Sequence, residues 1–83
     1  MWRITKAFEP YLKDSVGVSS RNWDASRAVK ATARFRMRDD DGILYVEGIS
    51  TSTSSFAPLD DYGEGGLGCT SIEYLEKGVW KPL

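Results

Sequence analysis

The fold is decided by residues 31–49, which read ATARFRMRDDDGILYVEGI. Apolar and polar residues alternate strictly before the acidic run, and a second strand-like run follows it. Because successive side chains of a β-strand point to opposite faces of the sheet, this period of two predicts strands. The Asp41-Gly42 pair is a strong signal for a two-residue turn with left-handed backbone at both positions. The segment therefore predicts a β-hairpin.

A two-residue turn at Asp41-Gly42 fixes the register of this hairpin. The expected pairs are Phe35 with Gly48, Met37 with Val46, Asp39 with Leu44, Arg34 with Ile49, Arg36 with Glu47 and Arg38 with Tyr45. One face is then apolar and directed to the core through Phe35, Met37, Leu44 and Val46. A four-residue loop keeps the same faces, whereas a three-residue loop puts the apolar side chains opposite the wrong side and is discounted.

Further strand signals flank the hairpin. Alternation over residues 2–8 predicts a first strand, and Pro10 places it at a sheet edge or a strand end. Residues 69–75 predict a strand that turns at Lys77-Gly78 into a short partner strand. Residues 23–29 favour at most a short helical turn before a strand from about residue 30, and one continuous strand is the alternative.

These signals predict one domain over residues 1–83, because a chain this short builds a single core. The domain is expected to be mainly β, or small α+β. It should hold a single antiparallel sheet of four to five strands with a central Asp-Gly hairpin and at most one short helix. The three tryptophans are expected in the core or at its rim, namely Trp2, Trp23 and Trp80.

Residues 50–68 show no clear periodicity, and loops of this length in small domains are commonly functional or disordered. Residues 63–68 formally match the G-x-G-x-x-G pattern of dinucleotide-binding turns. That motif needs a strand before it and a helix after it, whereas an acidic run precedes these residues and a strand-like segment follows them. We therefore predict a flexible loop whose glycines permit tight turns.

The composition disfavours catalysis. The chain has no histidine, so Cys69 has no imidazole to activate it and is expected to be a small core residue. The acidic run Asp39–Asp41 does not follow the alternating ligand spacing of a calcium loop. We expect no enzymatic activity, no catalytic residues, no cofactor and no metal site.

The sequence also suggests a location. No apolar run approaches the ~18 residues of a membrane span, and the first residues do not resemble a signal peptide. The single Cys69 excludes an internal disulfide, as is usual in the reducing cytosol. We expect no membrane association and a cytoplasmic location.

Charge is unevenly distributed along a chain whose net charge is −1. Residues 21–38 hold six basic side chains and one acid (+5), whereas residues 39–83 hold nine acids and two lysines (−7). Two candidate binding surfaces follow. The acidic segment comprises Asp60, Asp61, Tyr62 and Glu64. The arginine face comprises Arg34, Arg36, Arg38 and Tyr45.

In size and composition the chain is similar to small single-domain proteins carried by phages and mobile elements, some of which inhibit host complexes such as CRISPR effectors. The leading hypothesis is a non-enzymatic protein-binding domain, in which the acidic segment mimics DNA phosphate and occupies a basic channel of the partner. A first alternative is nucleic-acid binding through the arginine face. A second is a structural or accessory subunit that forms homo-oligomers by strand-edge pairing.

Overall fold

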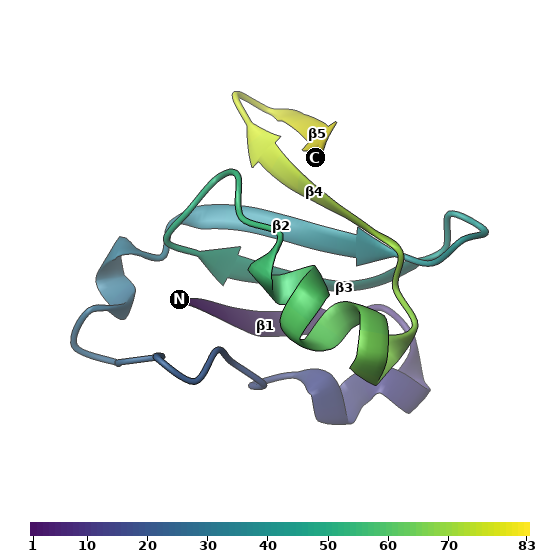
Figure 1. Cartoon of the computed structure of the whole chain (residues 1–83), viewed down its shortest axis with the longest axis horizontal. Coiled ribbons are helices and arrows are strands. Elements are labelled where there is room, and N and C mark those ends of the chain that lie inside the picture. The colour runs from purple at the N-terminus through teal and green to yellow at the C-terminus, as the bar shows by residue number, and fades with distance from the viewer.

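The computed structural model describes residues 1–83 as one five-stranded antiparallel sheet with a helix on one face (Figure 1). In the sheet order β1-β3-β2-β4-β5, the strands are β1 (Trp2–Ala7), β3 (Leu44–Ser50), β2 (Ala33–Arg38), β4 (Ser71–Glu76) and β5 (Val79–Pro82). The helical segments are the short 3-10 helices η1 (Pro10–Ser15) and η2 (Ala28–Lys30) and the wider π-type helix η3 (Leu59–Leu67). The predicted mainly β fold is confirmed.

The β2–β3 hairpin confirms the predicted register along most of its length. The observed pairs include Arg34 with Ile49, Phe35 with Gly48, Arg36 with Glu47 and Met37 with Val46. The register shifts beyond Met37, where Arg38 lies opposite Leu44. The predicted pairs of Arg38 with Tyr45 and of Asp39 with Leu44 are therefore wrong.

The turn of this hairpin is the reason for the shift. The Asp39 N–H donates to the Ile43 carbonyl at 3.1 Å, so the loop contains three residues rather than two. Gly42 has a φ of 79°, whereas Asp41 does not share the left-handed conformation that a type I′ turn needs. The extra residue on β3 forms a β-bulge at Tyr45, which restores the register beyond it. A three-residue loop is thus compatible with a core-facing Phe35, and its exclusion was wrong.

The Asp39 carboxylate stabilises this turn. Its Oδ1 accepts hydrogen bonds from the N–H groups of Asp41 at 3.0 Å and Ile43 at 2.8 Å. Short acidic side chains commonly satisfy loop amides in this way. The two-residue type I′ turn occurs instead between β4 and β5, where Lys77 and Gly78 have φ values of 52° and 79°. The predicted turn at these two residues is confirmed.

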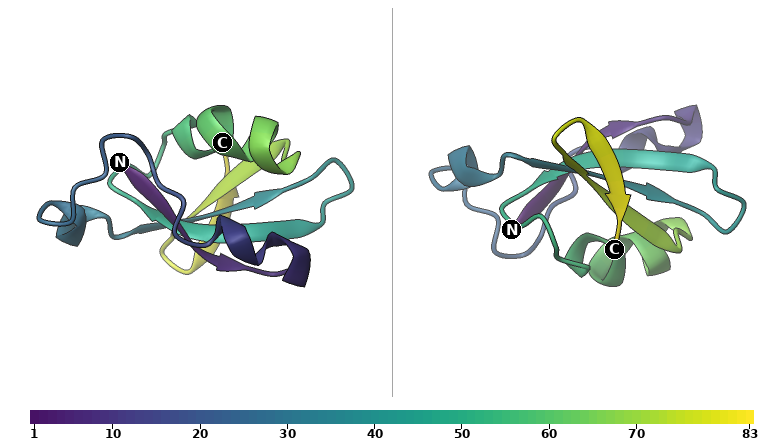
Figure 2. Two further views of the ribbon diagram at one scale, coloured as in Figure 1. Left: turned by 90° about the horizontal axis from the view of Figure 1, so that it is seen from below. Right: turned by 90° about the horizontal axis from the view of Figure 1, so that it is seen from above.

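The core lies between the sheet and η3, which covers one sheet face in both views of Figure 2. It consists of nine buried residues, Trp2, Ile4, Phe35, Met37, Val46, Leu59, Cys69, Ile72 and Tyr74. Leu44, predicted to face the core, is not among them, because the bulge places it opposite Arg38. Gly48 allows the Phe35 ring to lie directly over β3, since a Cβ at this position would collide with that ring.

The glycine-rich segment after residue 56 is helical, so the predicted flexible loop is wrong there. Leu59 is buried and Leu67 packs against the core, which anchors η3 to the sheet at both ends. Gly63 lies where a Cβ would collide with the Met37 side chain, so this glycine permits close packing rather than a turn. Gly68 ends the helix with a φ of 79°, and its N–H donates to the Glu64 carbonyl at 3.1 Å.

The outer edge of β1 is covered by residues 17–20. The Ile4 N–H donates to the Val18 carbonyl at 2.8 Å, and the Ser20 N–H donates to the Trp2 carbonyl at 2.9 Å. These hydrogen bonds anchor residues 17–20, for which the sequence predicts no helix or strand. A short helical turn does precede β2, but as η2 it covers Ala28–Lys30, at the end of the predicted range 23–29, and β2 begins at residue 33 rather than near residue 30. No helix is long and apolar enough to cross a membrane.

Candidate functional site

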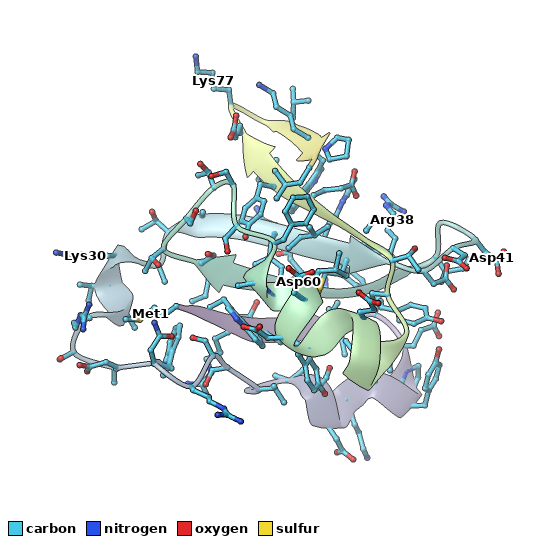
Figure 3. The ribbon with its side chains drawn as sticks, in the orientation of Figure 1. Met1, Lys30, Arg38, Asp41, Asp60 and Lys77 are labelled. Atoms are coloured by element: carbon cyan, nitrogen blue, oxygen red, sulfur yellow. The ribbon has the colours of Figure 1, made fainter.

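The two predicted surfaces lie on different layers of the molecule. Figure 3 shows Asp60 on the helix that covers the inner sheet face, and Arg38 at the end of β2 beside the hairpin loop. The arginines alternate along β2 with the buried Phe35 and Met37, so they occupy the outer face. The acidic segment and the arginine face therefore do not form one site.

The acidic segment lies entirely within η3. Asp60, Asp61 and Glu64 are exposed, and none of them forms an ion pair. Two of these carboxylates lie in the first turn, where the partial positive charge of a helix N-terminus favours them. The helix therefore presents three negative charges to solvent without an internal counter-charge.

Tyr62 has a different position from its acidic neighbours. It is partly buried and packs against the core, and its ring centroid lies 6.4 Å from that of Trp2. A Cβ at Gly66 would collide with the Tyr62 ring, so this glycine makes room for the tyrosine one turn away. Tyr62 thus connects the acidic helix to the core rather than standing free beside the carboxylates.

A groove adjoins this helix on the side of the first strand. It has a volume of about 700 Å³ and lies between Trp2 of β1, the covering residues around Ser20, and the start of η3. Asp61 and Tyr62 line it, whereas Asp60 and Glu64 do not. This groove could not be predicted from the sequence, because one of its walls consists of residues 18–22, which show no periodicity.

Neighbouring carboxylates balance most of the positive charge of the arginine face. The Arg36 and Arg38 Nε groups both donate to the same Glu73 oxygen, each at 2.8 Å. Arg34 donates to Glu47 at 2.9 Å. Three guanidinium groups therefore face two carboxylates, which leaves a local charge of only +1.

Glu73 is the centre of this network. Its side chain is only 15% exposed. Desolvation acts to raise the pKa of Glu73, but the hydrogen bonds and charges of Arg36 and Arg38 outweigh it and hold the pKa below its usual value. Glu73 is consequently ionised at neutral pH and forms ion pairs with both arginines.

An aromatic ring covers the same face. Trp80 of β5 lies 4.2 Å from the Arg36 guanidinium and 5.6 Å from that of Arg34, measured from ring centroid to Cζ. The predicted aromatic partner, Tyr45, lies elsewhere. The nearby Asp39 carboxylate and, after it, Tyr11 of η1 raise the pKa of the Tyr45 hydroxyl. Sequence reasoning missed Glu73 and Trp80, although alternation in β4 places Glu73 on the face opposite the buried Tyr74.

The other reactive side chains are Cys69 and the aspartates of the hairpin loop. Cys69 is fully buried, and desolvation raises the pKa of its thiol to about 11, which keeps it protonated. The three aspartates of the hairpin loop do not converge on a shared point, and no group of three or more acidic or cysteine side chains is placed to hold a metal ion.

We compared the chain with known protein families, curated proteins and solved structures. No family model, no curated protein and no solved structure matches the chain.

Proposed function

We propose that this chain is a non-enzymatic protein-binding domain that uses the acidic helix η3 to bind a basic surface of its partner. The observation that carries the proposal is the set of three exposed carboxylates, Asp60, Asp61 and Glu64, which have no ion-pair partner within the chain. Complementary charge on a partner would accelerate association and select that partner over acidic ones. A basic nucleic-acid channel, as in the host complexes that small phage proteins inhibit, is one surface of this kind.

The arginine face supports a binding function less well. Nucleic-acid affinity depends on free cations that neutralise phosphates. Here Arg36 and Arg38 already donate to Glu73, and Arg34 donates to Glu47. Binding a phosphate would require breaking these contacts, so the acidic helix is the better candidate.

The test is affinity capture from a lysate of the source organism with the purified domain as bait. Asp60→Asn/Asp61→Asn/Glu64→Gln removes three charges from η3. Asp14→Asn/Asp40→Asn/Asp41→Asn removes three charges from exposed, unpaired positions outside η3 and is the matched control. We expect proteins that are captured by the wild type and the control to be lost with the η3 variant and with rising salt. Equal capture by both variants would refute the proposal.

A further inference from the structure

A second, smaller hollow lies at the end of the molecule away from the hairpin loop. Figure 3 shows Met1 and Lys30 at this end and Asp41 at the other. The hollow has a volume of about 250 Å³ and is lined by Met1, Asn22, Arg27, Lys30 and Thr51. Two of these residues have basic side chains and none has an acidic one, so we call it the basic pocket.

Backbone hydrogen bonds fix both walls of the basic pocket. On one side, the Lys30 N–H donates to the Arg27 carbonyl at 3.1 Å. Residues three apart in such a 3-10 turn lie above one another, so both basic side chains project from the same side of η2. On the other side, the Thr51 N–H donates to the Met1 carbonyl at 3.0 Å, and the Met1 ammonium donates to Thr51 Oγ1 at 2.9 Å.

The basic side chains of this pocket lack a counter-charge. Neither Arg27 nor Lys30 forms an ion pair. The acid nearest to them in the sequence, Asp24, instead accepts hydrogen bonds from the Ser26 N–H at 3.0 Å and from the Ser26 hydroxyl at 2.7 Å. On the arginine face, by contrast, every guanidinium group pairs with a carboxylate. The basic pocket therefore gathers positive charge that no carboxylate of the chain contacts.

We propose that the basic pocket binds the phosphate group of a small phosphorylated molecule. A phosphate monoester carries a charge of about −1.5 to −2 at pH 7 and three strong acceptor oxygens. These oxygens match the donors of Arg27, Lys30 and the Asn22 amide, whereas a carboxylate offers one charge and two oxygens. The inference is independent of the proposed function, because no residue of η3 lines this pocket.

The groove beside η3 offers room for the rest of such a molecule. It has a volume of about 700 Å³ and shares Met1 and Asn22 with the basic pocket, so the two adjoin. Among the side chains of the groove, Arg21 and Asp61 carry opposite charges and the others are uncharged, which suits a neutral sugar. Cations gathered at one point favour a terminal phosphate, whereas a nucleic-acid backbone needs a charged groove that follows its successive phosphates.

The experiment is an NMR titration of the whole, ¹⁵N-labelled domain with ribose 5-phosphate at pH 7.5 and constant ionic strength. We expect saturable shifts of the amide signals of Asn22, Arg27 and Lys30. Unphosphorylated ribose and sodium acetate are the ligand controls, and neither should produce these shifts. No shift with ribose 5-phosphate, or equal shifts with acetate, would overturn the inference.

Two double variants separate the pocket from the general charge of the domain. Arg27→Gln/Lys30→Gln should weaken the binding of ribose 5-phosphate about tenfold or more, because two charge-assisted hydrogen bonds are lost. Lys13→Gln/Lys77→Gln is the matched control, since both lysines are exposed, form no ion pair and do not line the pocket. Equal weakening by the two double variants would contradict the assignment of the site.

A thymidine oligonucleotide with a 5′-hydroxyl end tests nucleic acid as the ligand, because all its phosphates are diesters. We expect it to bind more weakly than ribose 5-phosphate at the same phosphate concentration. If it shifts the Arg27 and Lys30 signals as strongly, the pocket recognises a nucleic-acid backbone and the inference is wrong.

Discussion

Glu73→Gln tests the ionic network on the outer face of the sheet. The substitution keeps the volume of the side chain and one acceptor oxygen, but it removes the charge that Arg36 and Arg38 share at 2.8 Å. The two guanidinium groups, with side-chain exposures of 20% and 31%, would then face each other without a counter-charge. The variant should therefore weaken both hydrogen bonds and add a repulsion between the two guanidinium groups.

The magnitude follows from these exposures. A hydrogen bond to a charged group contributes about 1.5–3 kcal/mol, so two of them set an upper limit of about 3–6 kcal/mol. Glutamine retains one acceptor, and the partly exposed arginines regain some hydration, which reduces the loss. We expect the free energy of unfolding to fall by about 2 kcal/mol, which corresponds to a Tm lower by about 10 °C.

Urea denaturation at pH 7 measures this loss, and Glu76→Gln is the matched control. Glu76 lies on the same strand, but its side chain is 40% exposed and its pair with Lys81 is 3.4 Å long. The control should lose at most about 0.5 kcal/mol. The Glu73 effect should also depend on pH. Because the pKa of Glu73 is lower in the folded state, its stabilisation is complete above the unfolded pKa of about 4.3.

That stabilisation is lost as the pH falls through the folded pKa of Glu73. The difference between the wild type and Glu73→Gln should therefore shrink as the pH falls below about 4. Either of two results would refute the reasoning. One is a loss no larger than that of Glu76→Gln. The other is a difference that does not change over this pH range.

Three further predictions concern single positions, each measured against the wild type. Gly48→Ala should lower the free energy of unfolding by about 3 kcal/mol, because its Cβ would meet the Phe35 ring. Gly65→Ala lies in open space on η3 and should raise the free energy of unfolding by about 0.5–1 kcal/mol. Equal urea midpoints for the two variants would contradict this prediction. Lys77→Asn should raise the Tm by several degrees, since asparagine tolerates the left-handed φ of 52° better than lysine, and an unchanged Tm would count against it. Cys69 should react with a thiol reagent such as DTNB at pH 8 only after unfolding, because burial raises its pKa to about 11, and rapid labelling of the native domain would disprove this.

The sequence predicted the hairpin well and its loop poorly, for one physical reason. The alternation of apolar and polar residues around Phe35 and Met37 indicates which face of β2 is buried. This prediction holds for every pair on the strand side of the bulge. A two-residue loop and a three-residue loop with a bulge at Tyr45 give the same register beyond the bulge. The pattern of Phe35 and Met37 therefore could not distinguish the two loops, and only the residues beside the turn were misplaced.

The helix η3 was missed because tertiary contacts override its local preferences. Its glycines have low helix propensity and were interpreted as loop residues. Gly63 instead permits contact with Met37, and Leu59 anchors the helix on the sheet. Periodicity over nine residues with three glycines does not encode that contact.

The candidate sites show the same limit. Alternation placed Arg34, Arg36 and Arg38 together on one face, as observed. The partner of Arg36 and Arg38 depends on β4 lying beside β2, and the strand order is not a local property of the sequence. Glu73 could be identified as the acid that these two arginines share only once that neighbouring strand was known.

The pairing of β1 with β3 has a consequence for the order of folding. The hairpins β2–β3 and β4–β5 close short loops, whereas Trp2 must reach Ser50 across most of the chain. Closing the longer loop costs more entropy, so β1 should dock after the hairpins have formed. Pulse-labelling hydrogen exchange would show this as later protection of β1 amides, and simultaneous protection would contradict it. The groove at Trp2 would then be the last part of the molecule to assemble and the first to be lost when the N-terminus frays.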